Sequence, residues 1–406
     1  MCYYCGNVFE SHQFDSVFSA SAGTNQTLAN YLRSGYWQDV PTSIRKFNLT
    51  NSGTYSKNGV LTYNTAGNSF DQDGLSVARS SIVEEAFKSL EEILGIDFQE
   101  TTDVDADFRF GDEDSGAYAS STFSGGYIDY ANINISSTWH GSLSGFGNYT
   151  FQTILHEIGH GLGLGHQGDY NGWATYSNNA KYANDSWQSS IMSYFDQAEN
   201  TSITASYAYL STFMPVDWIA LNDLYAAQGY STSNAFSGNT IYGFNTNISN
   251  STSAIFNKLS DWIDSTAFTI TDESGTDTLD FSGFSDNQNI NLNACEKGST
   301  SVFSSDIGGL VGNLLFSPGT LIENCISGSG NDWLTGNLAS NILEAGSGND
   351  TLSSASGNDT LDGGNGTDIV VFDGNYSEFS FSLSGDDLLV NNNFSDTFLL
   401  IDIETA

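Results

Sequence analysis

The sequence predicts an α+β protein in which a mixed domain of strands and helices precedes an all-β domain. Three observations support this prediction. From Tyr36 to about Tyr230, runs typical of strands alternate with runs typical of helices. After Tyr230 the chain is rich in Ser, Asn, Gly and Asp, and helix signals nearly vanish. Residues 327–371 then repeat with a period of nine, which predicts stacked, equivalent turns.

Periodicity identifies three elements of the mixed domain. VLTYNT (60–65) and ADFRF (106–110) are predicted to be strands. SSIVEEAFKSLEEIL (80–94) is predicted to be an amphipathic helix. The apolar face of this helix consists of Ile82, Ala86, Leu90 and Ile93.

Changes in composition divide the chain into four expected segments. The first is polar and rich in Ser and Asn, with little periodicity, and is predicted to be a leader or propeptide. The expected bounds are 1–33 for this leader, 34–230 for the mixed domain, 231–375 for the all-β domain and 376–406 for a C-terminal segment.

The chain is strongly acidic, with 48 Asp and Glu residues against 10 Lys and Arg residues. Nucleic acid or an anionic membrane surface would be repelled, so cations are the expected partners. Lys297 is the last basic residue and 15 carboxylates follow it, which predicts bound cations in this region. No stretch approaches the roughly 18 apolar residues of a membrane helix, and the N-terminus lacks the pattern of a classical secretory signal.

The stretch HEIGHGLGLGH predicts a zinc site. On a helix, His156 and His160 lie four residues apart on one face and point at one ion. A left-handed turn at Gly163 would end the helix and bring His166 back as the third ligand. The fourth position stays open for water, and Glu157 is placed to accept a proton from that water. The extended pattern HExxHxxGxxH is far more specific than HExxH alone.

Downstream, SIMSYF (190–195) is predicted to form a turn beneath the zinc ligands, with Met192 packing there without binding metal. The phenol of Tyr194 is a candidate to reach the zinc or the oxyanion that develops during the reaction. The alternative for Tyr194 is an ordinary buried tyrosine.

The nonapeptides resemble the RTX calcium repeat GGxGxDxUx, in which U is a large apolar residue. Gly-rich turns offer carbonyl and carboxylate oxygens to a hard cation, while each short strand sends one apolar residue inward. The resemblance implies calcium between turns two repeats apart, hence between Asp332 and Asp350, Asp350 and Asp368, and Asn341 and Asp359. An earlier segment, ESGTDTLDFSGFS (273–285), predicts a further site at Asp277 and Asp280. A disordered acidic tail is the alternative, but it does not predict such strict register.

Over about residues 36–375 the chain is similar to serralysin-type metalloproteases of the metzincin clan. The matching stretches are HEIGHGLGLGH with GDY (168–170), YANDSWQSSIMSYF (182–195), MPVDWIALNDLY (214–225), YGFNTN (242–247), TDTLDFSGFS (276–285) and IENCISGSGND (322–332). The resemblance implies a twisted, mostly parallel sheet with helices, followed by a calcium-bound parallel β-roll. It further implies a secreted, extracellular, monomeric zinc endopeptidase that cleaves proteins and is exported by a type I transporter.

The same resemblance assigns a cleft edge to Gly116, Ala117, Tyr118 and Ala119, where substrate would add as an antiparallel strand. Two features depart from the family: the chain has four cysteines, and it ends in FLLIDIETA. The second function considered is a calcium-dependent binding or matrix protein on an inactive protease scaffold. Because Glu157 accompanies all three histidines, we expect the enzyme.

The N-terminal MCYYCG contains a candidate switch. A thiolate of Cys5, or else of Cys2, would occupy the open zinc position and keep the enzyme latent. The alternatives are incidental thiols or a disulfide between these two cysteines. Cys295 and Cys325 are a further candidate disulfide pair.

Overall fold

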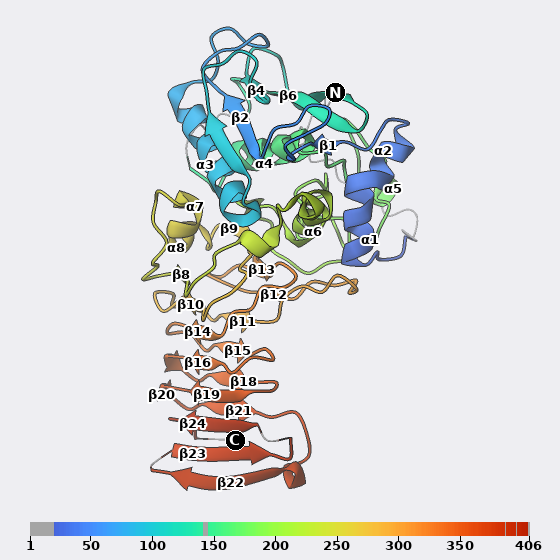
Figure 1. Cartoon of the computed structure of the whole chain (residues 1–406). Helices are drawn as coiled ribbons and strands as arrows, with labels where there is room; N and C mark the ends of the chain where they lie inside the picture. Colours follow the sequence, from blue (N-terminus) through green and yellow to red (C-terminus); the bar gives the residue numbers. More distant parts are fainter. Residues whose placement is uncertain (1–19, 141–144, 386, 395, 405–406) are drawn as a thin grey trace. The chain divides into compact units, whose positions relative to one another are not determined.

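The computed structural model describes residues 20–140, 145–385, 387–394 and 396–404 of the chain (Figure 1). The chain divides into an N-terminal unit, which runs to Ala235 and includes Glu296–Ser301, and a C-terminal unit of Phe236–Cys295 and Val302–Ala406. Helices and a mostly parallel sheet make up the first unit, and short parallel strands dominate the second. The predicted fold class is therefore confirmed.

The N-terminal unit contains a six-stranded sheet. Its strands are β1 (Lys46–Phe47), β2 (Val60–Asn64), β3 (Asp97–Glu100), β4 (Phe108–Gly111), β5 (Ala117–Ser124) and β6 (Tyr127–Ile135). The order is β1-β6-β4-β2-β3 with all neighbours parallel, and β5 pairs antiparallel with β6. Within the described chain β5 pairs with no second strand, so one of its edges is open.

Helices and short connecting elements complete this unit. They are α1 (Asn25–Asn30), the π-helix η1 (Tyr31–Gly35), α2 (Tyr36–Asp39), α3 (Val77–Leu94), α4 (Tyr149–Gly161), α5 (Tyr176–Asn179), β7 (Tyr209–Leu210), α6 (Pro215–Tyr225), and the 3-10 turns η2 (Ala226–Gln228) and η3 (Thr232–Asn234). The predicted apolar face of α3 is buried. On α3, the Phe87 ring packs 4.5 Å from Tyr63 of β2 and 5.2 Å from Phe108 of β4. Aromatic burial thus attaches α3 to the sheet.

The predicted end of the leader at residue 33 is wrong. Residues 25–33 are helical, and Leu28 and Leu32 are fully buried in the N-terminal unit. The carbonyl oxygen of Leu32 also accepts a hydrogen bond from Gly165, just before His166. These residues are therefore part of the fold that holds the third histidine.

The C-terminal unit is a stack of short strands that follow one another in chain order, and we call it the roll (Figure 1). One sheet has the order β22-β23-β24-β19-β16-β14-β10-β8, and a second has the order β11-β15-β18-β21. Strand bounds are β8 (Ile241–Gly243), β9 (Thr266–Ile270), β10 (Thr278–Asp280), β11 (Asn289–Asn291), β12 (Ser304–Ser305), β13 (Leu314–Phe316), β14 (Asn324–Ile326), β15 (Trp333–Thr335), β16 (Ile342–Glu344), β17 (Ser347–Gly348), β18 (Thr351–Ser353), β19 (Asn358–Asp362), β20 (Asn365–Gly366), β21 (Ile369–Val371), β22 (Phe379–Ser384), β23 (Asp387–Asn392) and β24 (Thr397–Ile401).

The nine-residue repeat alternates between these two sheets, so parallel neighbours lie 18 residues apart. Leu334 pairs with Leu352 and Leu352 with Val370 in one sheet, while Leu343 pairs with Leu361 in the other. All five side chains are buried, as the repeat predicts. Their burial provides one apolar residue per strand.

The C-terminal unit departs from the prediction of an all-β domain in one respect, and it also settles two smaller points. It contains α7 (Ala254–Asn257), α8 (Leu259–Trp262) and the 3-10 turn η4 (Tyr376–Glu378). Cys295 and Cys325 are both buried and form no disulfide with each other, so the candidate disulfide between them is wrong. The segment after residue 375 forms β22 to β24, and β24 continues the sheet by pairing parallel with β19.

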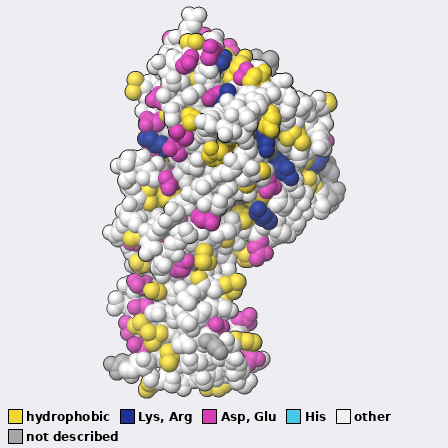
Figure 2. All heavy atoms as spheres, viewed as in Figure 1, with side chains coloured by type: hydrophobic (Ala, Val, Ile, Leu, Met, Phe, Trp, Pro, Cys, Tyr) yellow, Lys and Arg dark blue, Asp and Glu magenta, His cyan; other side chains and the backbone are white. Residues whose placement is uncertain are grey.

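The distribution of charge follows the sequence. On the face shown in Figure 2, Asp and Glu side chains lie along the roll, and after Lys297 the sequence contains no Lys or Arg. Across the described residues, we find no helix with the length and apolar character needed to cross a membrane.

Candidate metal centre and substrate cleft

Helix α4 carries the first two histidines of the motif. Asn148 caps the helix, because its side chain accepts a hydrogen bond of 3.1 Å from the Phe151 backbone. The chain leaves the helix through Gly163, which has φ +109°, a value that disfavours residues with a Cβ. A Cβ at Gly163 would lie 2.2 Å from the Arg45 carbonyl oxygen. Glycine is therefore required at the turn that returns the chain to His166.

The three histidines converge as predicted. One ligand atom from each of His156, His160 and His166 lies within 4.8 Å of those of the other two. The Nε2 atoms of His160 and His166 are 3.0 Å apart. Ring centroids are separated by 4.5 to 5.4 Å.

Backbone carbonyls fix the orientation of each ring. The Nδ1 atoms of His156, His160 and His166 each lie 2.8 Å from the carbonyl oxygens of Ile191, Leu164 and Tyr170, respectively. Because a carbonyl oxygen only accepts, Nδ1 carries the proton, and each Nε2 of a neutral ring presents a lone pair. Burial lowers the pKa of all three, that of His156 to about 4, so the rings are neutral at pH 7. Facing lone pairs 3.0 Å apart repel unless a cation lies between them, which fits a zinc ion.

The turn formed by residues 190–195, which we call the Met-turn, packs beneath this cluster. Met192 is fully buried, and its Sδ atom would lie 2.7 Å from a Cβ placed on Gly159 of α4. The carboxylate of Asp217, on α6, accepts hydrogen bonds from Ser190 Oγ at 2.6 Å and from the Ile191 backbone at 2.7 Å. Asp217 therefore fixes the carbonyl that holds His156. No motif in the sequence predicts this role of Asp217.

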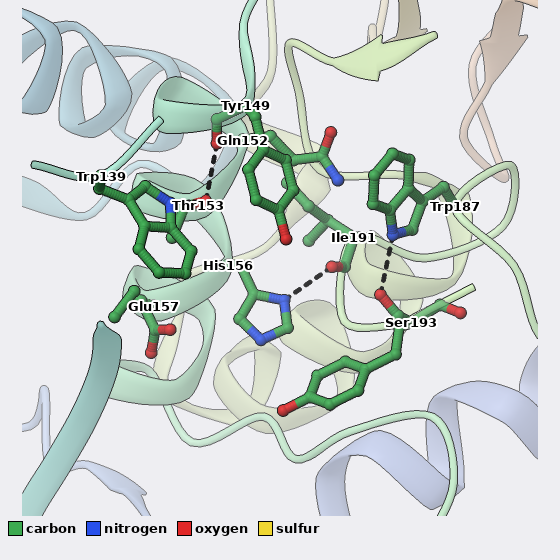
Figure 3. Close-up of a pocket in the computed structure, with 11 residues that line it drawn as sticks. Trp139, Tyr149, Gln152, Thr153, His156, Glu157, Trp187, Ile191 and Ser193 are labelled. Atoms are coloured by element: carbon green, nitrogen blue, oxygen red, sulfur yellow. Dashed lines mark hydrogen bonds between the residues drawn. The ribbon is translucent and has the colours of Figure 1, made fainter. Parts of the chain in front are cut away.

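Glu157 lies in the same cleft as His156 (Figure 3). It is 2% exposed, and its Oε2 atom accepts no hydrogen bond from the described residues. Burial raises the pKa of Glu157 to about 8, against a smaller opposing effect of a hydrogen bond from the Ala119 backbone. A raised pKa makes the Glu157 carboxylate a stronger base than an exposed glutamate, and its unpartnered oxygen is available to accept a proton from water.

Tyr194 contacts the cluster through its ring. The ring centroid lies 4.5 Å from that of His166 and 6.2 Å from that of His156. The Gly172 backbone donates a hydrogen bond of 3.4 Å to the Tyr194 hydroxyl. The phenol is thus at the edge of the metal centre.

An aromatic pocket opens beside His156 and Glu157 (Figure 3). Its volume is about 450 Å³, part of it open to solvent. Trp139, Tyr149 and Trp187 form its walls together with Ile191. The Tyr149 ring stacks between the two tryptophans, with centroids 6.1 and 6.0 Å away. Such a pocket suits an apolar side chain.

The predicted cleft edge forms the start of β5. Gly116 has φ +83° and leads into the strand, and Ala117 lines the pocket next to Glu157. Tyr118 is tied to Asp114 by a hydrogen bond of 2.5 Å, and the Ala119 backbone bonds Glu157. The structure therefore brings this segment to the candidate centre.

Carboxylates of the repeats form a regular ladder in the roll. The Oδ1 atom of Asp350 accepts from the Asp332 backbone, and that of Asp368 accepts from the Asp350 backbone, at 2.7 and 2.8 Å. Asp359 accepts from the Asn341 backbone at 2.7 Å in the same way. Each acceptor lies 18 residues after its donor, as in the three predicted pairs. The Asn341 amide departs from the pattern, because it donates to the Glu323 carbonyl.

Several oxygens of this ladder lack a hydrogen-bond donor. Among the described residues, the Oδ2 atoms of Asp277, Asp350 and Asp368 are buried and accept no hydrogen bond. Burial raises the pKa of Asp350 to about 6. Orphaned buried carboxylate oxygens of this kind fit ligands of a hard cation.

Two glutamates join the ladder outside the repeat register, and sequence reasoning missed them. Glu323 accepts from the Asp277 backbone and Glu404 from the Asp368 backbone, each at 2.7 Å. Asp280 lies outside the ladder, because its oxygens accept hydrogen bonds from Ser282 and Asn245. Cys2 and Cys5 lie outside the described residues.

The relatives found by comparison with known proteins are metalloproteases of the serralysin type. Residues 232–402 match the family model for the C-terminal region of peptidase M10 serralysins. The chain is 43% identical over 203 residues to metallopeptidase AprA of Pseudomonas marginalis, covering 48% of this chain and 39% of that protein. It is 37% identical over 290 residues to a serralysin of Photorhabdus luminescens, covering 68% and 54%. It is 41% identical over 221 residues to serralysin C of Dickeya chrysanthemi, covering 54% and 42%.

The chain thus spans about half, or less, of the length of these relatives. Among solved structures, high choriolytic enzyme 1, a hatching enzyme zinc-protease of the medaka Oryzias latipes, aligns with a TM-score of 0.28 and 16% identity. That alignment covers 46% of this chain and 99% of the fish protein.

Proposed function

We propose that the chain, which is similar in sequence to serralysin-type metalloproteases of the metzincin clan, is a zinc endopeptidase of this kind that hydrolyses peptide bonds of proteins. The observation that carries this proposal is the convergence of three neutral histidines next to a buried carboxyl group with an unpartnered oxygen. His156, His160 and His166 would hold the zinc ion. Zinc supplies a Lewis acid that lowers the pKa of a bound water to about 7.

The remaining roles follow from the positions of the side chains. Glu157 Oε2 accepts the proton of the attacking water and delivers it to the leaving nitrogen. The Tyr194 hydroxyl donates a hydrogen bond to the oxygen of the tetrahedral intermediate. The open edge of β5 aligns the substrate backbone. The aromatic pocket takes the substrate side chain next to the scissile bond and keeps water away from it.

We further propose that the roll binds calcium at the carboxylate ladder. The supporting observation is the set of buried, unpartnered oxygens on Asp277, Asp350 and Asp368, of which the last two follow Lys297, the last basic residue of the chain. Asp332, Asp359 and Asn341 complete the proposed ligand set. A roll that binds calcium would fold outside the cell, where calcium is abundant. From the resemblance to serralysins we propose that the protein is secreted through a type I transporter and is a monomer.

Substitution of Glu157 tests the activity. Glu157→Gln keeps the size of the side chain and removes the proton acceptor, so we expect zinc content to be kept and caseinolysis to fall at least 1,000-fold (about 4 kcal/mol). Glu92→Gln, at a partly buried position of α3 outside the metal centre, is the matched control and should keep full activity. Activity of Glu157→Gln within tenfold of the unaltered protein would refute the assignment.

Calcium removal tests the roll, and the same preparation tests the second candidate function. Far-UV circular dichroism during a calcium titration should show β-structure forming as calcium binds. A protein that binds calcium and zinc but cleaves neither casein nor peptides would instead be a calcium-dependent binding protein.

The thiol switch remains a separate hypothesis. Residues 25–33 are folded, so the trimming that tests it has to end before residue 20. We expect Cys5→Ser, or such trimming, to abolish a lag in activity, with Cys2→Ser as the matched control.

A further inference from the structure

Asp185 is a fully buried carboxylate near the metal centre that neither the motifs nor the proposed mechanism uses. It lies in the loop between α5 and Met192 and is 0% exposed. The Asp185 backbone is anchored on both sides: its N–H donates to the Tyr182 carbonyl, and its carbonyl accepts from Asn200 Nδ2. The side chain is therefore held in a fixed place.

The carboxylate of Asp185 joins two segments of the metal centre. The Tyr170 hydroxyl donates to it, at 3.2 and 3.0 Å from the two oxygens. The Ser193 hydroxyl donates to Oδ1 at 2.6 Å. Tyr170 is the residue whose carbonyl oxygen holds His166 Nδ1 at 2.8 Å. Ser193 lies between Met192 and Tyr194.

These contacts constrain the relative position of both segments. The Tyr170 and Tyr194 rings pack with centroids 4.7 Å apart, and both rings contact that of His166. A shift of the Tyr170 hydroxyl would turn the residue and move its carbonyl away from His166. Since this carbonyl sets the direction of the His166 lone pair, the shift would degrade the ligand geometry.

The chemistry at Asp185 is unusual for a purely structural side chain. Among the described residues it forms no ion pair, so its charge is balanced by hydroxyl donors alone. Burial raises the pKa of Asp185 to about 7. A buried carboxylate without a cation is costly, whereas an apolar residue of similar size would avoid that cost.

We propose that Asp185 is a positioning residue for the metal centre: by holding Tyr170 and Ser193 together, it fixes the carbonyl that orients His166 and the backbone that carries Tyr194. This inference rests on the proposed function, because it assumes that the three histidines bind zinc. Asp185 touches no substrate atom in this arrangement. It complements Asp217, which fixes the carbonyl that orients His156.

Zinc affinity of the metal-free, full-length protein tests the proposal, measured by competition with a chelator at pH 7.5. Tyr170→Phe removes one hydroxyl and breaks the bond to Asp185 without leaving a large cavity. We expect its zinc dissociation constant to rise about 10- to 100-fold. Tyr176→Phe is the matched control, because Tyr176 is an equally buried tyrosine whose hydroxyl bonds Ala183 and Ser202. Its zinc affinity should stay within twofold.

A double variant separates positioning from general stability. If Asp185 acts through Tyr170, Asp185→Asn should weaken zinc binding, and adding it to Tyr170→Phe should change the affinity less than the sum of the two single effects. Thermal unfolding of the metal-free proteins provides the second readout: Tyr170→Phe and its control Tyr176→Phe should lose similar stability, so that a difference in zinc affinity between them does not reflect general stability.

Four results would overturn the inference. Equal zinc affinities of Tyr170→Phe and Tyr176→Phe, or strictly additive effects in the double variant, would refute the positioning role alone. If Tyr170→Phe fails to fold, Asp185→Asn with an unchanged zinc dissociation constant refutes it equally. Failure of the unaltered protein to bind zinc would refute the proposed function as well.

Discussion

Replacement of Gly163 by alanine should damage the metal centre more than the same replacement at an open site. Gly163 has φ +109°, and an added Cβ would lie 2.2 Å from the Arg45 carbonyl oxygen, next to β1. The same turn carries the Leu164 carbonyl that holds His160, and it leads to His166. Gly229 is the matched control, since it has φ +94° and no atom within 4 Å of an added Cβ.

The two variants share one cost and differ in another. An alanine in the left-handed region costs about 1–2 kcal/mol at either position. At Gly163 the backbone must also move to relieve the contact with Arg45, which adds roughly 1–3 kcal/mol. Gly163→Ala should therefore lose about 2–5 kcal/mol of unfolding free energy, against about 1–2 kcal/mol for Gly229→Ala. If zinc binding has to restore the displaced turn, the additional 1–3 kcal/mol corresponds to roughly 5- to 150-fold weaker zinc affinity.

Urea unfolding of the metal-free protein and chelator competition for zinc measure these two quantities. Retained zinc affinity in Gly163→Ala, with a loss of stability equal to that of Gly229→Ala, would show that the turn does not constrain the ligands. Glycine would then not be required at position 163 for the geometry of the zinc ligands.

Three further predictions concern the roll and the pocket. Leu352→Ala should destabilise the calcium-bound roll by roughly 2–5 kcal/mol, because Leu352 is fully buried between Leu334 and Val370. Trp333→Ala, at a half-exposed position, should cost less. Equal losses of unfolding free energy in the two variants would contradict this packing. In the calcium-free protein, burial raises the pKa values of the ladder carboxylates Asp332, Asp350, Asp359 and Asp368, that of Asp350 to about 6. The folded state therefore binds more protons than the unfolded state between about pH 4 and 6. Stability should then be highest at the acidic end and fall as pH rises through 6, and chemical unfolding at pH 5 and 7.5 with chelator present checks that sign. Peptides with Phe directly after the scissile bond should be cleaved with a kcat/KM at least about tenfold above that of peptides with Asp at the same position. The reason is that the side chains of the aromatic pocket offer no cation to a carboxylate. Equal kcat/KM values would count against this role of the pocket.

Local patterns account for most of what the sequence predicted. A period of nine with one apolar residue per unit led directly to strands that alternate between two sheets, because each unit is long enough for one turn and one strand. HEIGHGLGLGH specified a helix, a left-handed turn and a returning histidine within eleven residues. These features depend on contacts between residues close in sequence, which spacing alone can express.

The contributions that the sequence analysis missed all depend on distant contacts. Asp185 and Asp217 have the composition of ordinary surface acids, and only the fold reveals that they are buried against the Met-turn. Glu404 enters the ladder because β24 pairs with β19, a register that the repeat does not encode. Leu28 and Leu32 are too few to establish a helical period, so composition alone predicts that their segment belongs to the leader.

The spacing of the ladder also restricts how a chain with this repeat can change in length. Strands of the same sheet recur every 18 residues, so β14, β16 and β19 belong to one sheet and β15, β18 and β21 to the other. Loss or gain of a single nonapeptide would move every later strand to the opposite sheet and separate each carboxylate from its backbone donor. Insertions and deletions in this region should therefore survive as pairs of nonapeptides, which add or remove one complete turn.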